Sequence, residues 1–242
     1  MIRAIIFDFN GVIADDETPH LLCYQQALAE EGLSLTKDEY YGAYLGMDER
    51  TCTRLLLTAR DGTCDDLLLQ RIMNRKAVLF RANTAAHKPA LFLGIIEFVK
   101  AAKPTYRLAI ASGGRRDQID AALAGTAIEQ DFELIVSAED CHIGKPDPAI
   151  YRLTCAGLNI GSTSEAITPA HCLVIEDSLA GIRSAKAAGM RVLALATTYP
   201  IDKLGEADVV LPNLHEISPD AVIGRIAQTG QGGRLSATQP QQ

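Results

Sequence analysis

From residue 89 onward, short apolar runs alternate with segments of helical period, and this alternation limits the fold more than any other feature of the chain. The expected strands are residues 106–111, 132–136, 172–175, 192–195 and 208–211. The helices expected in this part are residues 91–101, 115–123, 148–156 and 179–188. Strands that alternate with helices pair in parallel, so the pattern predicts a doubly wound parallel sheet with helices on both faces.

One more apolar run lies near the N-terminus, separated from the others by a stretch of different character. Residues Ala4–Phe7 form this run and predict a buried strand. Residues 17–87 have helical period and no strand pattern, and Thr36 and Glu39 form the capping box that opens a helix. We therefore expect four helices to be inserted after the first strand.

The chain thus divides into two expected domains and a tail. Residues 1–16 and 88–227 form the α/β core, and residues 17–87 form the helical insert. Residues 228–242 are polar and rich in Gly and Gln, and we expect them to be disordered.

The composition favours a cytoplasmic protein that binds a small molecule. The chain has 242 residues, 48% of them hydrophobic, and a net charge of −7 without a run of Lys or Arg, which disfavours nucleic acid and anionic membrane surfaces as partners. Its six cysteines are scattered without a C-x-x-C pair, a pattern that favours free thiols. The sequence shows no export leader and no membrane-spanning run, and it carries no signal of oligomeric state.

Polar residues follow four of the expected strands, at the point where each strand ends. In chain order they are Asp8 and Asn10, Ser112 and Gly113, Lys145, and the pair Glu176 and Asp177. Each alone could cap a helix or face solvent, but ligands bind at the carboxyl edge of a parallel sheet, where these residues meet. Carboxylates from two strands suit Mg²⁺, and a lysine, a hydroxyl and glycine N–H groups suit a phosphoryl group. A carboxylate can also attack phosphorus to form an aspartyl phosphate.

Four segments resemble, in order, the motifs of the haloacid dehalogenase superfamily of phosphotransferases. They are DFNGVIAD, IASGG, GKPDP and VIEDSLAGIRSAKAAGM. Within the superfamily the chain resembles the subgroup of beta-phosphoglucomutase and phosphoglycolate-phosphatase-like enzymes with a helical cap. The resemblance extends to about residue 215 and implies a Rossmann-like core with an inserted four-helix cap domain.

The resemblance also implies a role for each strand-end residue. Asp8 would be the nucleophile, Ser112 would bind the phosphoryl group, and Lys145 would stabilise its charge. The implied ligands of Mg²⁺ are Asp8, the backbone carbonyl of Asn10, Glu176 and Asp177. Asp15 matches the closing acid of the first motif, and we expect it to be structural.

Further residues match the substrate site of the family. Gly11 would allow the sharp turn after the first strand, and Gly113 would approach the phosphoryl group. The segment 46–50 matches the specificity loop, which makes Gly46 and Arg50 candidate substrate contacts. Arg75 and Lys76 from the last cap helix are further candidates. The implied partner is a small phosphorylated metabolite such as a sugar phosphate.

The chain departs from the family at Asn10. Phosphatases and mutases of the family have a second aspartate there as general acid and base, and its loss typically costs about 10²–10⁴ in rate. Four explanations stay open. In the first, another acid, Asp16 or Glu17, carries the proton, and in the second the enzyme acts only on activated substrates. In the third, the protein is a weak or silent phosphometabolite-binding or regulatory protein. In the fourth, the fold performs different chemistry, such as phosphonate cleavage. The sequence names no substrate and does not separate phosphatase from mutase.

Overall fold

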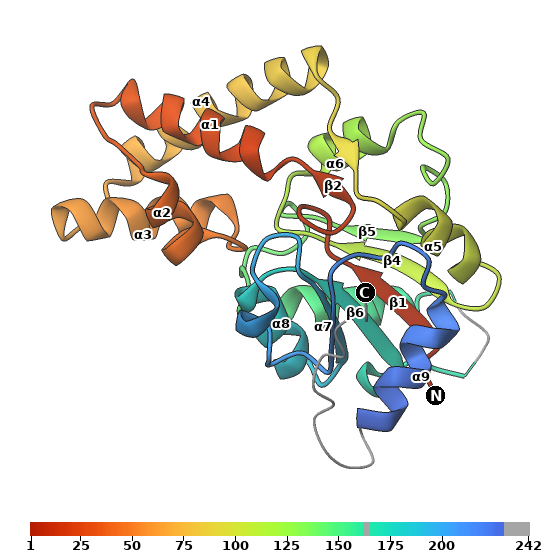
Figure 1. Cartoon of the computed structure of the whole chain (residues 1–242). Coiled ribbons are helices and arrows are strands. Elements are labelled where there is room, and N and C mark those ends of the chain that lie inside the picture. Colours follow the sequence, from red (N-terminus) through yellow and green to blue (C-terminus); the bar gives the residue numbers. More distant parts are fainter. Residues whose placement is uncertain (162–164, 230–242) are drawn as a thin grey trace, which may run out of the picture.

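The computed structural model describes residues 1–161 and 165–229, and its centre is a six-stranded parallel sheet (Figure 1). The strands are β1 (Ala4–Phe7), β4 (Arg107–Ala111), β5 (Leu134–Val136), β6 (Cys172–Glu176), β7 (Arg191–Leu195) and β8 (Val209–Leu211). They are ordered β5-β4-β1-β6-β7-β8, and every neighbouring pair is parallel. The expected doubly wound α/β fold is therefore confirmed.

Helices cover both faces of the sheet because successive strand residues point to opposite sides. Ile5 and Phe7 of β1 pack under one set of helices, and Ala4 and Ile6 pack under the other. The first set is α5 (Ile95–Ala102), α6 (Arg116–Leu123) and α9 (Pro219–Thr229); the second is α7 (Ala149–Gly157) and α8 (Leu179–Ala187). Two short 3₁₀ turns, Pro169–His171 and Ile201–Lys203, complete the core.

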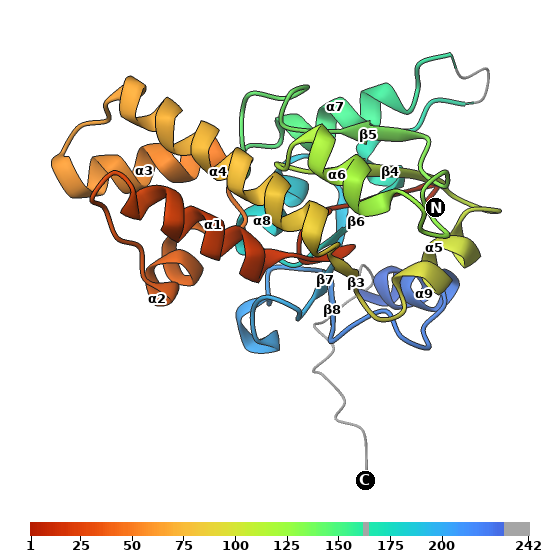
Figure 2. The same cartoon turned by 90° about the horizontal axis from the view of Figure 1, so that it is seen from above.

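The helical insert lies to one side of the sheet, beyond the carboxyl end of β1 (Figures 1 and 2). It contains α1 (Glu17–Ala29), α2 (Lys37–Glu39), the π-helix η1 (Tyr40–Tyr44), α3 (Glu49–Asp61) and α4 (Asp66–Ala86). We call these elements the cap. They enclose a hydrophobic cluster of their own around Leu28, Leu56 and Ile72. The Thr36–Glu39 capping box is present at the start of α2, as expected.

Two short strands connect the cap to the core. β2 (Ala14–Asp15) precedes the cap and β3 (Ala90–Leu91) follows it, and the two pair antiparallel. The chain therefore enters and leaves the cap through adjacent segments.

Two local expectations are wrong. The helix expected from residue 91 begins only at Ile95, because Leu91 belongs to β3 and Gly94 has a left-handed φ of 84° that separates strand from helix. The helix α9 was not expected, and it includes residues 228 and 229, where disorder was predicted. The rest of the predicted tail, residues 230–242, lies outside the described residues. No helix in the described ranges is long and apolar enough to cross a membrane.

Candidate active site

Lys145 joins two acids that follow neighbouring strands. Its ammonium lies 2.9 Å from Oδ2 of Asp8 and 2.7 Å from Oε1 of Glu176. Asp8 comes directly after β1, Glu176 ends β6, and Lys145 lies in the loop after β5. All three side chains are almost completely buried. The sheet order thus brings together residues that are far apart in the sequence.

One oxygen of each of Asp8, Glu176 and Asp177 lies within 4.8 Å of the others, as a shared cation would require. Glu176 is heavily hydrogen-bonded: Oε1 also accepts from the Tyr151 hydroxyl at 2.7 Å, and Oε2 accepts from two backbone N–H groups and the Ser178 hydroxyl. Asp177 accepts a hydrogen bond from the Thr198 hydroxyl. This all-oxygen donor set fits Mg²⁺, with Asp8 and Asp177 more available to it than Glu176.

The buried charges shift one another's pKa values. Burial raises the pKa of Asp8 to about 7, although the Lys145 charge opposes the rise. Burial and the neighbouring acids also raise the pKa of Asp177. Burial alone would lower the pKa of Lys145, but the charges of Asp8 and Glu176 outweigh it and raise that pKa. A divalent cation would favour the ionised form of both aspartates.

Asn10 is held by hydrogen bonds on both ends of its amide. Its Nδ2 donates to the two carboxylate oxygens of Asp16 at 2.9 and 2.8 Å, and its Oδ1 accepts from the Ser112 hydroxyl at 3.4 Å. His20 lies next to this pair, with Nε2 3.1 Å from the Asn10 nitrogen and 3.6 Å from Asp16. The other His20 nitrogen lies 2.7 Å from the Lys76 ammonium. A polar chain therefore runs from the end of β1 into the cap.

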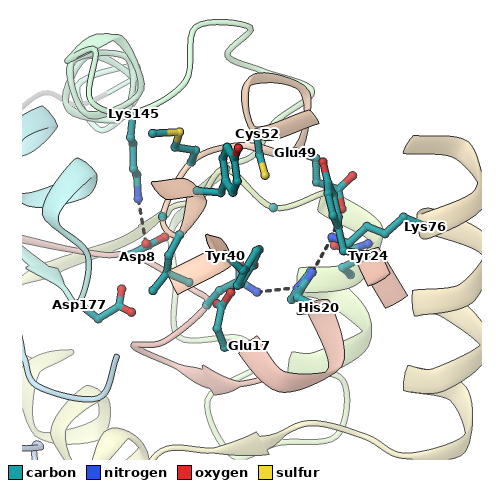
Figure 3. Close-up of a pocket in the computed structure, with 18 residues that line it drawn as sticks. Asp8, Glu17, His20, Tyr24, Tyr40, Glu49, Cys52, Lys76, Lys145 and Asp177 are labelled. Atoms are coloured by element: carbon teal, nitrogen blue, oxygen red, sulfur yellow. Dashed lines mark hydrogen bonds and ion pairs between the residues drawn. The ribbon is translucent and has the colours of Figure 1, made fainter. Parts of the chain in front are cut away.

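A pocket of about 700 Å³, its opening to solvent included, lies between Asp8 and the cap. Figure 3 shows Asp8 and Lys145 on one side of it and His20, Glu49 and Lys76 on the other. The lining residues include Asp8, Asn10, Lys145 and Asp177 from the core, and Glu17, His20, Tyr24, Tyr40, Gly46, Glu49 and Lys76 from the cap region, with Gly113 and Gln118 near α6.

Not every residue expected at the substrate site lines this pocket. Gly113, Gly46 and Lys76 do, whereas Arg50 is exposed and lines a neighbouring hollow. Arg75 pairs with Glu30 on the cap surface. Gly11 instead packs against Asp177, where a Cβ would overlap the carboxylate.

The pocket residues that the sequence did not single out include His20, Glu49 and Gln118. Glu49 is the first residue of α3, and its carboxylate pairs with the buried Lys76. His20 stacks on Phe80 of α4 with ring centroids 3.9 Å apart. The only sequence signal for Glu49 was its place in the specificity loop beside Arg50, and no motif marked the other two.

The cap touches the core through backbone at glycine positions. A side chain at Gly46 would overlap Ser178 of the core, and one at Gly144 would overlap Asp48 of the cap. A Cβ at Gly113 would lie 3.5 Å from Asp48. Among the described residues, each ion pair of the cap helices is formed within the cap or with Asp16 directly before α1.

Replacing Lys145 by Met should strongly destabilise the metal-free protein. The change leaves the buried carboxylates of Asp8 and Glu176 without their shared cation, and breaking a buried pair costs about 3–5 kcal/mol. Urea denaturation at neutral pH measures this loss. The matched control is Arg75→Met, which removes a solvent-exposed pair and should leave the unfolding curve nearly unchanged. Equal effects of the two variants would contradict the prediction.

The Glu49–Lys76 pair should stabilise the fold in a pH-dependent way. Burial by itself raises the pKa of Glu49, but the attraction of Lys76 outweighs it and holds that pKa below the usual 4.5. A lowered folded-state pKa means that the contribution is present above pH 4.5 and is lost as pH falls through the folded-state value. The difference in unfolding free energy between the native protein and Glu49→Gln should therefore shrink on acidification. A difference that grows in acid would contradict this.

Comparison with known proteins points to one family. A profile of the haloacid dehalogenase-like hydrolases matches residues 2–189. CbbY of Rhodobacter capsulatus is 29% identical over 230 residues, which cover 91% of this chain and 97% of that protein. The phosphorylated carbohydrates phosphatase of Thermotoga maritima is 28% identical over 191 residues, 78% of this chain and 82% of that protein.

Solved structures of a related protein show the same fold with ligands bound. The crystal structure of CbbY from Rhodobacter sphaeroides in complex with phosphate has a TM-score of 0.79 and 26% identity, over 92% of this chain and 100% of that chain. An aspartate-to-asparagine mutant of that protein, in complex with xylulose-(1,5)bisphosphate, has a TM-score of 0.79 and 27% identity, over 91% of this chain and 99% of that one.

Proposed function

The chain belongs to the haloacid dehalogenase-like hydrolases, and from that premise we propose that it is a Mg²⁺-dependent phosphatase of a small phosphorylated metabolite, acting through phospho-Asp8. The observation that carries the proposal is the position of Asp8. It lies on the pocket wall beside Lys145 and Asp177, opposite the cap. Relatives that act on or bind phosphorylated carbohydrates support a sugar phosphate or a similar compound as substrate.

Each residue of the site would have a separate role in the reaction. An oxygen of Asp8 attacks phosphorus, and the bond from phosphorus to the leaving oxygen breaks. Lys145 and the N–H groups near Gly113 stabilise the charge on the phosphoryl oxygens. Mg²⁺, held by Asp8, Asp177 and the carbonyl of Asn10 with Glu176 beside them, would neutralise charge on the transferring group. Water then attacks phosphorus, which releases phosphate and restores Asp8.

A proton must reach the leaving alcohol, and Asn10 cannot supply it. We assign this task to Glu17, which lines the pocket together with Asp8. Burial raises the pKa of Glu17 above its usual value, which is the direction that suits a general acid. Asp16 contacts Asn10 directly, but it is 2% exposed and is absent from the pocket wall, so its part is to hold the amide. After transfer, the Glu17 carboxylate takes a proton from the attacking water.

The competing function is a catalytically silent phosphometabolite-binding protein, which Asn10 favours. The deciding experiment is Mg²⁺-dependent phosphate release from acetyl phosphate and a panel of sugar phosphates, on the native protein and Asn10→Asp side by side. We expect the native protein to hydrolyse sugar phosphates at a rate similar to that of the variant. Activity in the variant alone would show an intact scaffold whose natural role is binding.

A further inference from the structure

The positive charge on the cap side of the pocket is already neutralised. Lys76 is 3% exposed, and its ammonium contacts the Glu49 carboxylate and lies 2.7 Å from His20 Nδ1. The same ammonium lies over the rings of Tyr24 and Phe80, 5.7 and 5.6 Å from their centroids. Lys76 therefore has little capacity left to bind an anion from the substrate.

On this side of the pocket, the polar groups without a partner among residues 1–161 and 165–229 are neutral or negative. The second carboxylate oxygen of Glu49 and that of Glu17 accept no hydrogen bond from any residue in the described ranges. Gln118 lines the pocket and is 8% exposed, and its buried side-chain nitrogen has no hydrogen-bond partner in the part of the chain that the structure describes. A buried donor without a partner is costly, so Gln118 indicates a ligand that accepts from it.

The remaining nearby cations lie outside the pocket. Arg50 and Arg115 line the neighbouring hollow, where Arg115 also pairs with Asp117 at 3.2 Å. The Asp48 carboxylate packs against Gly144 and close to Gly113, beside both spaces. Four carboxylates and two paired ammonium groups line the pocket itself. A Mg²⁺ ion would offset the negative charge near Asp8 but not the charge of Glu49 on the cap side.

We propose that the pocket selects a monophosphate ester of a hydroxyl-rich alcohol, neutral or amine-bearing, and rejects a leaving group that carries a second phosphate. Hydroxyl or ammonium groups donate to Glu49, and a substrate oxygen accepts from Gln118. A second phosphate would meet the Glu49 carboxylate with no unpaired cation among the described residues of the pocket wall, and such like-charge contact opposes binding. The inference rests on the proposed phosphatase function and narrows its substrate class.

Selectivity is measured first as kcat/KM with Mg²⁺ for glucose 6-phosphate, glucosamine 6-phosphate and fructose 1,6-bisphosphate, with acetyl phosphate as the common reference. We expect both monophosphates to exceed the bisphosphate at least about tenfold, the ratio that 1.4 kcal/mol would give. Gln118→Leu should lower kcat/KM for the two hexose monophosphates about tenfold and leave acetyl phosphate unchanged. Preference for the bisphosphate would overturn the proposal.

Glu49→Gln gives the most direct test of the proposed selectivity, because it leaves the Lys76 ammonium without its paired carboxylate. It should shift selectivity toward the bisphosphate at least about tenfold. The control Arg71→Gln removes an exposed charge from α4, the helix that carries Lys76, and should leave the selectivity unchanged. Circular dichroism checks that both variants fold. An unchanged ratio of kcat/KM between monophosphate and bisphosphate in folded Glu49→Gln would contradict the proposal. Loss of bisphosphate turnover in Arg50→Gln would also contradict it, because the second phosphate would then bind in the neighbouring hollow.

Binding separates this inference from the proposed function. Calorimetric titration of the Asp8→Asn variant with the same three compounds reports the preference of the pocket without any turnover. Tighter binding of the monophosphates supports the inference, and tighter binding of the bisphosphate overturns it. Absence of turnover of every phosphate ester by the native protein would contradict the phosphatase function alone.

Discussion

Replacing Asp8 by Asn should reduce phosphatase activity at least about 10⁴-fold and abolish the phosphoenzyme, because an amide oxygen is a poor nucleophile toward phosphorus. The fold should survive, since Lys145 keeps its 2.7 Å contact with Glu176. Rapid-quench samples analysed by intact mass spectrometry would show the phosphoryl group on the native protein only.

The control for this variant is Asp15→Asn in the same motif. Asp15 is exposed on β2 and lies outside the pocket. Its replacement should therefore leave phosphate release and phosphoenzyme formation near native levels. Phosphoenzyme in the Asp8 variant would mean that another side chain is the nucleophile.

Replacing Glu17 by Gln should produce the second largest loss, and the loss should depend on the leaving group. Turnover of sugar phosphates should fall by about 10²–10⁴, because their alcohol leaves poorly without a proton. Turnover of acetyl phosphate should change little, since its leaving group needs no proton. Steady-state rates on both substrates, measured with one preparation, give the comparison.

Two further variants sharpen the test of Glu17. Adding Asn10→Asp to Glu17→Gln should restore sugar phosphate turnover, because a carboxyl group then follows the nucleophile by two residues. Asp16→Asn should cost less than Glu17→Gln, since Asp16 only holds the amide of Asn10. A larger loss in Asp16→Asn, confined to sugar phosphates, would assign the proton to Asp16 instead.

The core of the site could be predicted from the sequence because it follows from the sheet. Apolar runs identify the strands, and parallel strands bring their carboxyl ends to one edge, so the sequence predicts that Asp8, Lys145 and Glu176 lie together. Their contacts in the structure match that expectation, while their catalytic roles stay predictions. The adjacency of β1 and β6 places Asp8 beside Glu176, and the loop after β5 brings Lys145 to both.

The cap side could not be predicted in the same way. The specificity loop pointed to Arg50, yet Glu49 faces the pocket and Arg50 does not. Consecutive helical residues point about 100° apart, so an uncertainty of one residue at the start of α3 decides which side chain enters. His20 of α1 and Gln118 of α6 line the same pocket only because the cap lies over the core, and no local pattern encodes that arrangement.

The glycine contacts between cap and core have a consequence for how the protein responds to salt. Gly46 packs on Ser178 and Gly144 packs on Asp48 by shape, while the ion pairs of the cap helices stay on the cap's own side. Salt screens exposed charges beyond about 8–10 Å but hardly affects close van der Waals contact. The position of the cap should therefore vary little with ionic strength, whereas a methyl group at Gly46 or Gly144 would hold it away from the core at any salt concentration.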